Sequence, residues 1–176
     1  MSTSAPSSPP LSGPPPAGPP ALSSVRAEPK NVRPSPAALE AWRLFLRAHA
    51  TVIRELEAEL VLEQGLPLSF YDVLVQLVEA PEHRLRMTEL ADRVMLSRSG
   101  LTRLVDRLVR DGLVERQACE GDARGTFTVL TAAGLQRLRE AAPTHLRGVE
   151  EHMISRLSDA ELAQLATLMG RLLETD

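Results

Sequence analysis

Two amphipathic stripes separated by a short break define the segment that begins at Met87. Apolar residues recur at spacings of three and four positions up to Val94, and the same spacing starts again after residues 95–97. One continuous helix would keep a single register, so a stripe that restarts after three residues predicts two helices crossing at a steep angle. The apolar positions are Met87, Leu90, Ala91 and Val94 in the first helix, and Leu101, Leu104, Val105 and Leu108 in the second.

A β-hairpin is predicted directly after the second helix. Gly112 stands where a left-handed residue ends helices. Residues 113–118 and 126–130 have the composition of strands, and the polar loop 119–125 between them contains glycine. Two helices followed by a hairpin predict a winged helix-turn-helix, with the loop as the wing, in a mainly α (α+β) fold.

The polar face of the second helix supplies candidate DNA-contacting residues. Guanidinium groups and short hydroxyls can contact base edges and phosphates in a major groove. At the wing, Arg124 is expected to enter a minor groove, with Asp122 orienting its guanidinium. The alternative is an ordinary turn aspartate and a solvated arginine. The candidates on the helix are Arg98, Ser99, Thr102, Arg103 and Arg110.

The first 35 residues differ in composition from the rest of the chain. Eleven of the 14 prolines lie at or before Pro36, and this segment has no apolar periodicity, so we expect a disordered tail. It lacks the pattern of a secretory signal, no later stretch reads as a membrane span, and one cysteine gives no disulfide framework. These features predict a soluble cytoplasmic protein that does not enter a membrane.

Long amphipathic segments flank the predicted winged module. Ser35 and Pro36 open a helix that stops near Gly65, and a shorter helix follows from Ser69, with Asp72 at capping-box spacing. A third segment runs from 131 to 155, with a bend expected at Pro143, before a last helix with the capping-box spacing of Ser158 and Glu161.

These outer helices are expected to form a dimerisation region. A single winged module does not need two long arms, whereas two copies can bury them against each other; the alternative is that the arms fold back on their own module. The chain is therefore divided into a tail (1–35), an N-terminal dimerisation helix (36–66), a DNA-binding domain (67–131) and C-terminal dimerisation helices (132–176).

Four motifs resemble the multiple antibiotic resistance regulator (MarR) family over roughly residues 36–175: SRSGLTRLVDRL from Ser97, DGLVER from Asp111, Asp-x-Arg-Gly from Asp122 and LTAAG from Leu130. The resemblance implies a homodimeric, ligand-responsive transcription factor, usually a repressor. Its two recognition helices would occupy successive major grooves of a pseudo-palindromic operator in double-stranded DNA.

The resemblance also implies a small-molecule effector, often an aromatic acid or phenol, bound between the dimer helices and the winged module. Trp42, Phe70, Tyr71 and His83 are the candidates for contacting it, and the alternative for each is an ordinary core or loop residue. The four histidines are scattered without metal-ligand spacing, so neither a metal nor a cofactor is expected.

Other functions remain as alternatives. Cys119 at the root of the wing can make the protein a redox-responsive regulator, since Arg116 and Arg124 nearby would favour a thiolate. A helical protein-interaction module without DNA affinity is a further alternative. No phosphate-binding glycine loop or nucleophile motif is present, so an enzyme is not expected.

The chain has a net charge of −3, but residues 84–124 contain nine Arg against seven acidic residues, so a DNA contact depends on local geometry.

Overall fold

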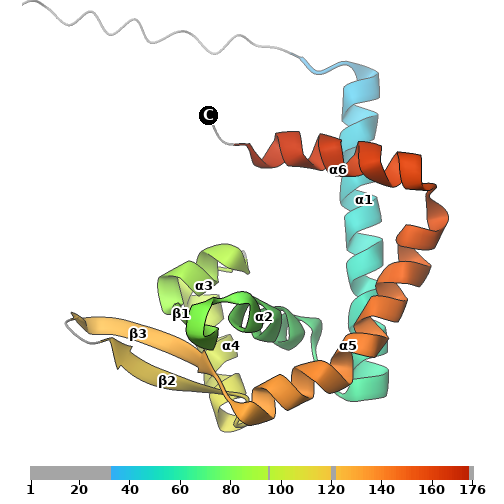
Figure 1. Cartoon of the computed structure of the whole chain (residues 1–176). Helices are drawn as coiled ribbons and strands as arrows, with labels where there is room; N and C mark the ends of the chain where they lie inside the picture. Colours follow the sequence, from blue (N-terminus) through green and yellow to red (C-terminus); the bar gives the residue numbers. More distant parts are fainter. Residues whose placement is uncertain (1–32, 95, 120–121, 175–176) are drawn as a thin grey trace, which may run out of the picture. The chain divides into compact units, whose positions relative to one another are not determined.

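The computed structural model describes residues 33–94, 96–119 and 122–174, apart from the side chains of residues 119 and 122–124. Within these residues the chain is mainly helical with a small antiparallel sheet, as the sequence predicts (Figure 1). The predicted disordered tail lies almost entirely outside the described residues. The helices are α1 (Pro36–Glu59), α2 (Leu68–Glu79), α3 (Met87–Arg93), α4 (Arg98–Arg110), α5 (Ala132–His152) and α6 (Asp159–Leu173), and the strands are β1 (Arg84–Arg86), β2 (Val114–Cys119) and β3 (Asp122–Leu130).

The first long helix continues through a π-helical turn, Leu60–Gln64, and ends at Gly65 as predicted. Gly65 has φ of 60°, and its N–H donates to the carbonyls of Leu60 and Val61 at the start of the turn. The next helix begins differently from the prediction. Ser69 does not cap α2, which starts after Pro67; instead the Leu68 N–H donates to Glu57 Oε2 at 2.6 Å. The prediction of a Ser69–Asp72 capping box was wrong, because a carboxylate from α1 accepts the hydrogen bond from a free backbone N–H at the start of α2.

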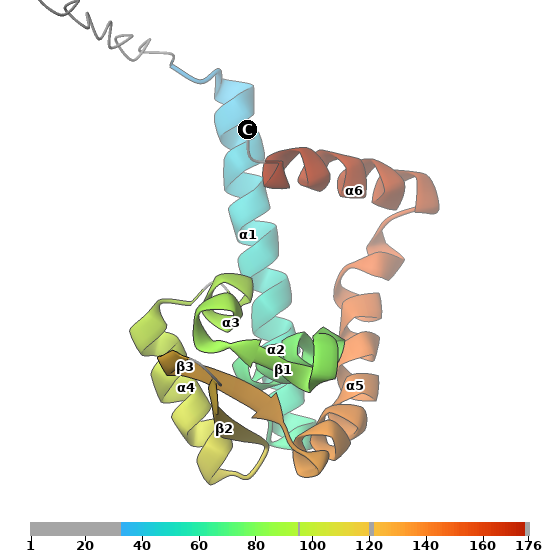
Figure 2. The same cartoon turned by 60° about the vertical axis from the view of Figure 1, so that its left-hand side comes forward.

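The winged module combines a three-stranded sheet in the order β1-β3-β2 with α2, α3 and α4, all of which pack against it (Figure 2). The predicted helix-turn-helix is confirmed, and Gly112 has the expected left-handed φ of 70°. Strand β1 was not predicted, because three residues are too few to show an alternation; it pairs with residues 127–129 of β3.

The predicted wing loop 119–125 was too long. The ladder between β2 and β3 continues outward past a register shift at Ala118, so that Cys119 pairs with Asp122 and residues 122–125 belong to β3. Backbone pairing therefore extends through residues whose polar and glycine-rich composition had indicated a loop.

Helix α5 joins the winged module to the outer helices. It is capped by Thr131, whose hydroxyl accepts from the Gly134 N–H at 3.0 Å, and it packs against both α1 and α2. Pro143 lies inside this helix, and Figure 1 shows its axis turning along its length. A proline removes one helical hydrogen bond, which favours such a turn. The capping box of Ser158 and Glu161 at the start of α6 is confirmed.

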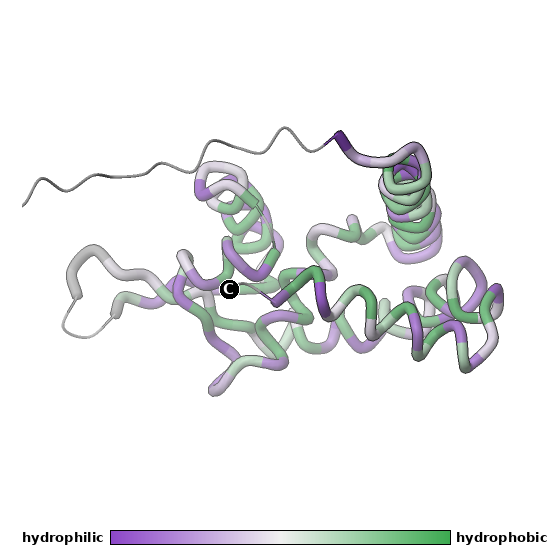
Figure 3. Tube along the Cα trace, turned by 90° about the horizontal axis from the view of Figure 1, so that it is seen from above, coloured by the Kyte–Doolittle hydropathy of each residue, from purple (hydrophilic) through white to green (hydrophobic). Residues whose placement is uncertain are grey.

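The buried core lies in the winged module and at the ends of α1 and α5 that meet it. Residues such as Leu60, Leu74, Leu90 and Leu108 are fully buried there. In contrast, hydrophobic residues recur along α1 and α6 (Figure 3), and neither α6 nor most of α1 contains a buried residue. Among the described helices, none has both the length and the apolar content needed to cross a bilayer.

Candidate nucleic-acid interface

Helix α4 separates its buried and polar residues cleanly. Ser97 caps it by accepting from the Gly100 N–H at 3.2 Å. Leu101, Leu104, Val105 and Leu108 face the core, as the spacing predicts. The opposite side of the helix is exposed and holds all five candidates from the sequence: Arg98, Ser99, Thr102, Arg103 and Arg110. A helix buried on one side with hydroxyls and guanidinium groups on the other can be inserted into a major groove.

An ion pair connects this helix to the wing. Arg116 Nη1 on β2 lies 2.7 Å from Asp106 Oδ1 on α4, and both side chains are partly exposed. Asp106 is therefore paired with a protein group. From the sequence, Arg116 was considered only as a neighbour of Cys119. The period of two in a strand puts Arg116 on the same face as the buried Val114, and this was the signal that could have placed it beside α4.

A groove beside the ion pair extends the polar surface from α4 to the sheet. It has a volume of about 450 Å³, and Arg98 and Thr102 from α4 meet Thr88 from α3 and Thr126 from β3 across it. Arg116 also lines this groove, which makes α3, α4 and both wing strands parts of one continuous surface. The side chains of Asp122 and Arg124 lie outside the described part of the chain, so their pairing stays a prediction.

A separate cavity of about 710 Å³ lies between α2, the end of α3 and α5. Of the four effector candidates, Tyr71 lines it. Phe70 is buried elsewhere, with the Arg107 guanidinium 5.4 Å from its ring centroid. Trp42 is 56% exposed on α1, and His83 forms a 3.0 Å hydrogen bond with the Val78 carbonyl in a turn.

Polar residues that were not among the effector candidates complete the wall of this cavity: Asp72, Gln76, Glu79, Arg93, Arg139 and His145. The His145 ring lies 4.3 Å from that of Tyr71, centroid to centroid. Burial lowers the pKa of His145 and raises that of Tyr71, so both side chains are neutral near pH 7. The cavity thus combines apolar walls, a neutral aromatic pair, two guanidinium groups and the carboxyl groups of Asp72 and Glu79.

The fold and the exposed face of α4 define a winged helix-turn-helix protein with a cavity between that module and a connecting helix. Comparison with known proteins gives the family. The sequence profile of the MarR family matches residues 64–125. The crystal structure of AbsC, a MarR family transcriptional regulator from Streptomyces coelicolor, is 34% identical with a TM-score of 0.73, and the match covers 80% of this chain and 95% of that one. The chain belongs to the MarR family of winged helix-turn-helix transcriptional regulators.

Two further relatives are informative. Sco3205 from S. coelicolor, whose structure was solved in complex with DNA, is 34% identical with a TM-score of 0.75, over 80% of this chain and 89% of that chain. The transcriptional repressor YetL of Bacillus subtilis is 34% identical over 111 residues, 63% of this chain and 66% of YetL. The chain thus spans just under two thirds of this curated relative. These relatives are regulators, in agreement with the expectation that the chain is not an enzyme.

Proposed function

We propose that this protein is a sequence-specific, double-stranded DNA-binding transcriptional repressor. The observation that supports this most directly is the exposed face of α4, where Arg98, Thr102 and Arg103 project from a helix whose other face is buried. The similar protein Sco3205 was crystallised with DNA, and the similar protein YetL is a repressor. A role on DNA requires the compartment that holds the chromosome, which agrees with the cytoplasmic location expected from the sequence.

The repressor acts as a homodimer. Large apolar side chains on α1 and α6 are exposed in the single chain, with Trp42 at 56%, Leu44 at 55% and Leu172 at 69%. Water-exposed apolar surface on this scale is favourable to bury, and a second copy offers the same surface in return. Two-fold symmetry would then direct the two α4 helices to successive half-sites of a pseudo-palindromic operator.

Arg103 and Arg98 have different roles in this proposal. Arg103 lies in the second turn of α4 on its outward face, where it can pair with guanine edges. Arg98 lies in the first turn beside the groove to the wing, where it can hold a phosphate. The Asp106–Arg116 ion pair fixes the angle between the helix and the wing, so both elements meet the DNA together.

The first experiment is a footprint on the region upstream of the gene. Two recognition helices in successive major grooves should protect half-sites whose centres lie about 10 base pairs apart, and affinity should fall steeply as salt is raised. A protein that binds one isolated half-site as a monomer would contradict the proposed dimer. A protein that binds no DNA would instead be a helical interaction module.

Alanine variants separate base reading from positioning. Arg103→Ala should weaken binding by about 1–3 kcal/mol and relax the preference at one or two base pairs. Arg98→Ala should weaken binding to all sequences alike. Arg54→Ala on α1, whose side chain pairs with its neighbour Glu55, is the matched control and should leave DNA affinity unchanged. Equal, sequence-independent losses in both α4 variants would show that Arg103 contacts only the backbone of the DNA.

A small aromatic acid or phenol is the proposed effector, and the 710 Å³ cavity is its binding site. An aromatic ring would contact Val75, Leu138 and Ala142, while Arg93 and Arg139 would face its carboxylate or phenolate. A panel of such compounds should release the protein from its operator, and Arg139→Ala should weaken the response to acids. If peroxide rather than these compounds releases the DNA, and Cys119→Ser abolishes that release, the redox alternative is correct.

A further inference from the structure

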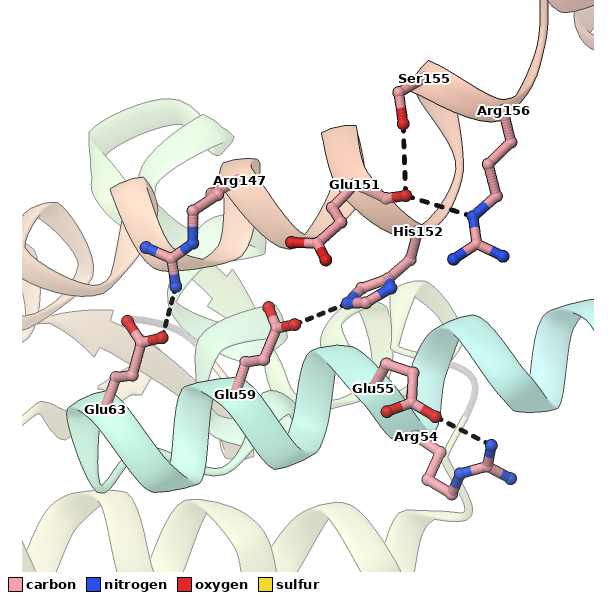
Figure 4. Close-up of polar contacts among 9 residues, drawn as sticks. All are labelled: Arg54, Glu55, Glu59, Glu63, Arg147, Glu151, His152, Ser155 and Arg156. Atoms are coloured by element: carbon pink, nitrogen blue, oxygen red, sulfur yellow. Dashed lines mark hydrogen bonds and ion pairs between the residues drawn. The ribbon is translucent and has the colours of Figure 1, made fainter.

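Glu59 at the end of α1 faces Glu151 and His152 at the end of α5 (Figure 4). One ligand atom from each of these three side chains lies within 4.8 Å of the others. His152 Nε2 is 2.6 Å from Glu59 Oε1, and the two side chains are only 13% and 26% exposed. The cluster joins residues more than ninety positions apart, which is why the spacing of the histidines in the sequence predicted no metal.

Glu59 is held with half of its hydrogen-bonding capacity unused. Its Oε2 atom is buried and has no hydrogen-bond partner among the described residues. Gly148 on α5 makes this position possible, since a Cβ there would lie 2.6 Å from Glu59 Oε2 and 2.7 Å from Leu56 Cδ2. A carboxylate oxygen removed from water without a partner is unfavourable, and it therefore favours a cation that can bind it.

The charges around the cluster leave it anionic. The neighbouring cation, Arg147, forms an ion pair with Glu63, whose carboxylate lies 2.5 Å from Arg147 Nη2. This hydrogen bond is the main reason that the pKa of Arg147 is raised, and Glu59 and Glu151 add smaller contributions. The Glu151 carboxylate itself has no hydrogen-bond or ion-pair partner within the part of the chain that the structure describes.

We propose that Glu59, Glu151 and His152 form a binding site for a divalent first-row transition metal, with Zn²⁺ as the best fit. One imidazole and two carboxylates are ligands that Zn²⁺ accepts, whereas Mg²⁺ and Ca²⁺ prefer oxygen ligands alone. Ligand atoms around tetrahedral Zn²⁺ lie about 3.3 Å apart. Small side-chain rotations reach that spacing, with the close His152–Glu59 hydrogen bond opening as both groups turn to the ion. Water completes the coordination.

The site is separate from the DNA-binding surface and from the cavity at His145, whose ring packs on Tyr71. A bound ion would bridge α1 and α5 at the point where α5 ends. The alternative is that the Glu59–His152 pair alone connects the two helices and needs no metal.

The test is a titration of Zn²⁺ into the chelator-treated full-length protein carrying Cys119→Ser, which removes the thiol as a competing ligand. We expect one Zn²⁺ per chain and a rise in Tm of roughly 5–10 °C at a hundredfold excess over Kd. Glu59→Gln and His152→Gln should each weaken Zn²⁺ binding at least tenfold, because changes even to outer-shell partners have effects of that size. His49→Gln, at an exposed position on α1, is the matched control and should leave binding unchanged.

Several results would overturn the proposal: no Zn²⁺ binding, equal affinity for Mg²⁺, or unchanged binding in Glu59→Gln and His152→Gln. X-ray absorption of the Zn²⁺ complex of the unsubstituted chain decides the case if a variant does not fold. A shell of one imidazole and oxygen ligands supports the site, whereas a shell containing sulfur, or oxygen alone, contradicts it.

Discussion

Replacing Gly134 with alanine should destabilise the junction between the wing and α5. Gly134 is buried in the first turn of α5, and a Cβ on it would overlap the backbone oxygen of Leu113 and lie 2.9 Å from Leu130 Cδ1. The Leu113 carbonyl cannot simply move away. It accepts from the Thr131 N–H at 3.2 Å and from the Thr131 hydroxyl at 2.9 Å, which together connect the start of α5 to the residue just before β2.

The size of the effect follows from three contributions. Forcing an extra carbon into a packed site costs about 1–3 kcal/mol. Strain on the two Thr131 hydrogen bonds adds up to about 1 kcal/mol each. The higher helix propensity of alanine offsets about 1 kcal/mol of this loss in the free energy of unfolding. The middle of these ranges gives a net loss in the free energy of unfolding of about 2 kcal/mol, which corresponds to a fall in Tm of roughly 4–8 °C for a chain of this size.

Thermal unfolding followed by circular dichroism measures this change. Gly170→Ala is the matched control, because Gly170 lies in α6 and a Cβ added to it would meet no atom within 4 Å. The helix-propensity gain should therefore appear alone in this control, as an unchanged or higher Tm. If Gly134→Ala melts at the same temperature as the unsubstituted protein, the close approach to Leu113 does not constrain this junction.

Three further predictions concern pH, the wing and the last helix. Burial holds the pKa of His145 below its ordinary value of 6.5, so the unfolded chain binds this proton more readily than the folded protein does. The free energy of unfolding therefore falls as the pH drops through about 6.5, and His145→Phe should reduce the loss in Tm between about pH 7.5 and pH 5.5. Asp122→Ala and Arg124→Ala should both weaken DNA binding in a fluorescence anisotropy assay, and the double variant should be no weaker than Arg124→Ala, whereas additive losses would contradict an aspartate that acts through the arginine. Ser158→Ala should lower the free energy of unfolding by about 1 kcal/mol in a urea titration, because its hydroxyl accepts from the Glu161 N–H at the start of α6; a smaller change than in Ser155→Ala would contradict this.

The helix-turn-helix and its polar face could be predicted from the sequence because both depend on short-range patterns. The period of Leu101, Leu104, Val105 and Leu108 determines which side of α4 is buried, and therefore which side presents Arg103. The same is true of the left-handed Gly112 and of the Ser158 capping box, since each involves residues within one turn of each other. Local chemistry alone was sufficient at these positions.

Only the tertiary structure decided the contacts between distant segments. Glu57 replaced Ser69 at the start of α2, strand β1 formed because β3 offered it a free edge, and Arg116 on the sheet reached Asp106 on α4. The cavity beside Tyr71 and the meeting of Glu59 with His152 likewise depend on how α1, α2 and α5 pack. A repeating pattern reports which face of an element is buried, but it does not report against which partner or in what register. That information arises only when the elements pack together.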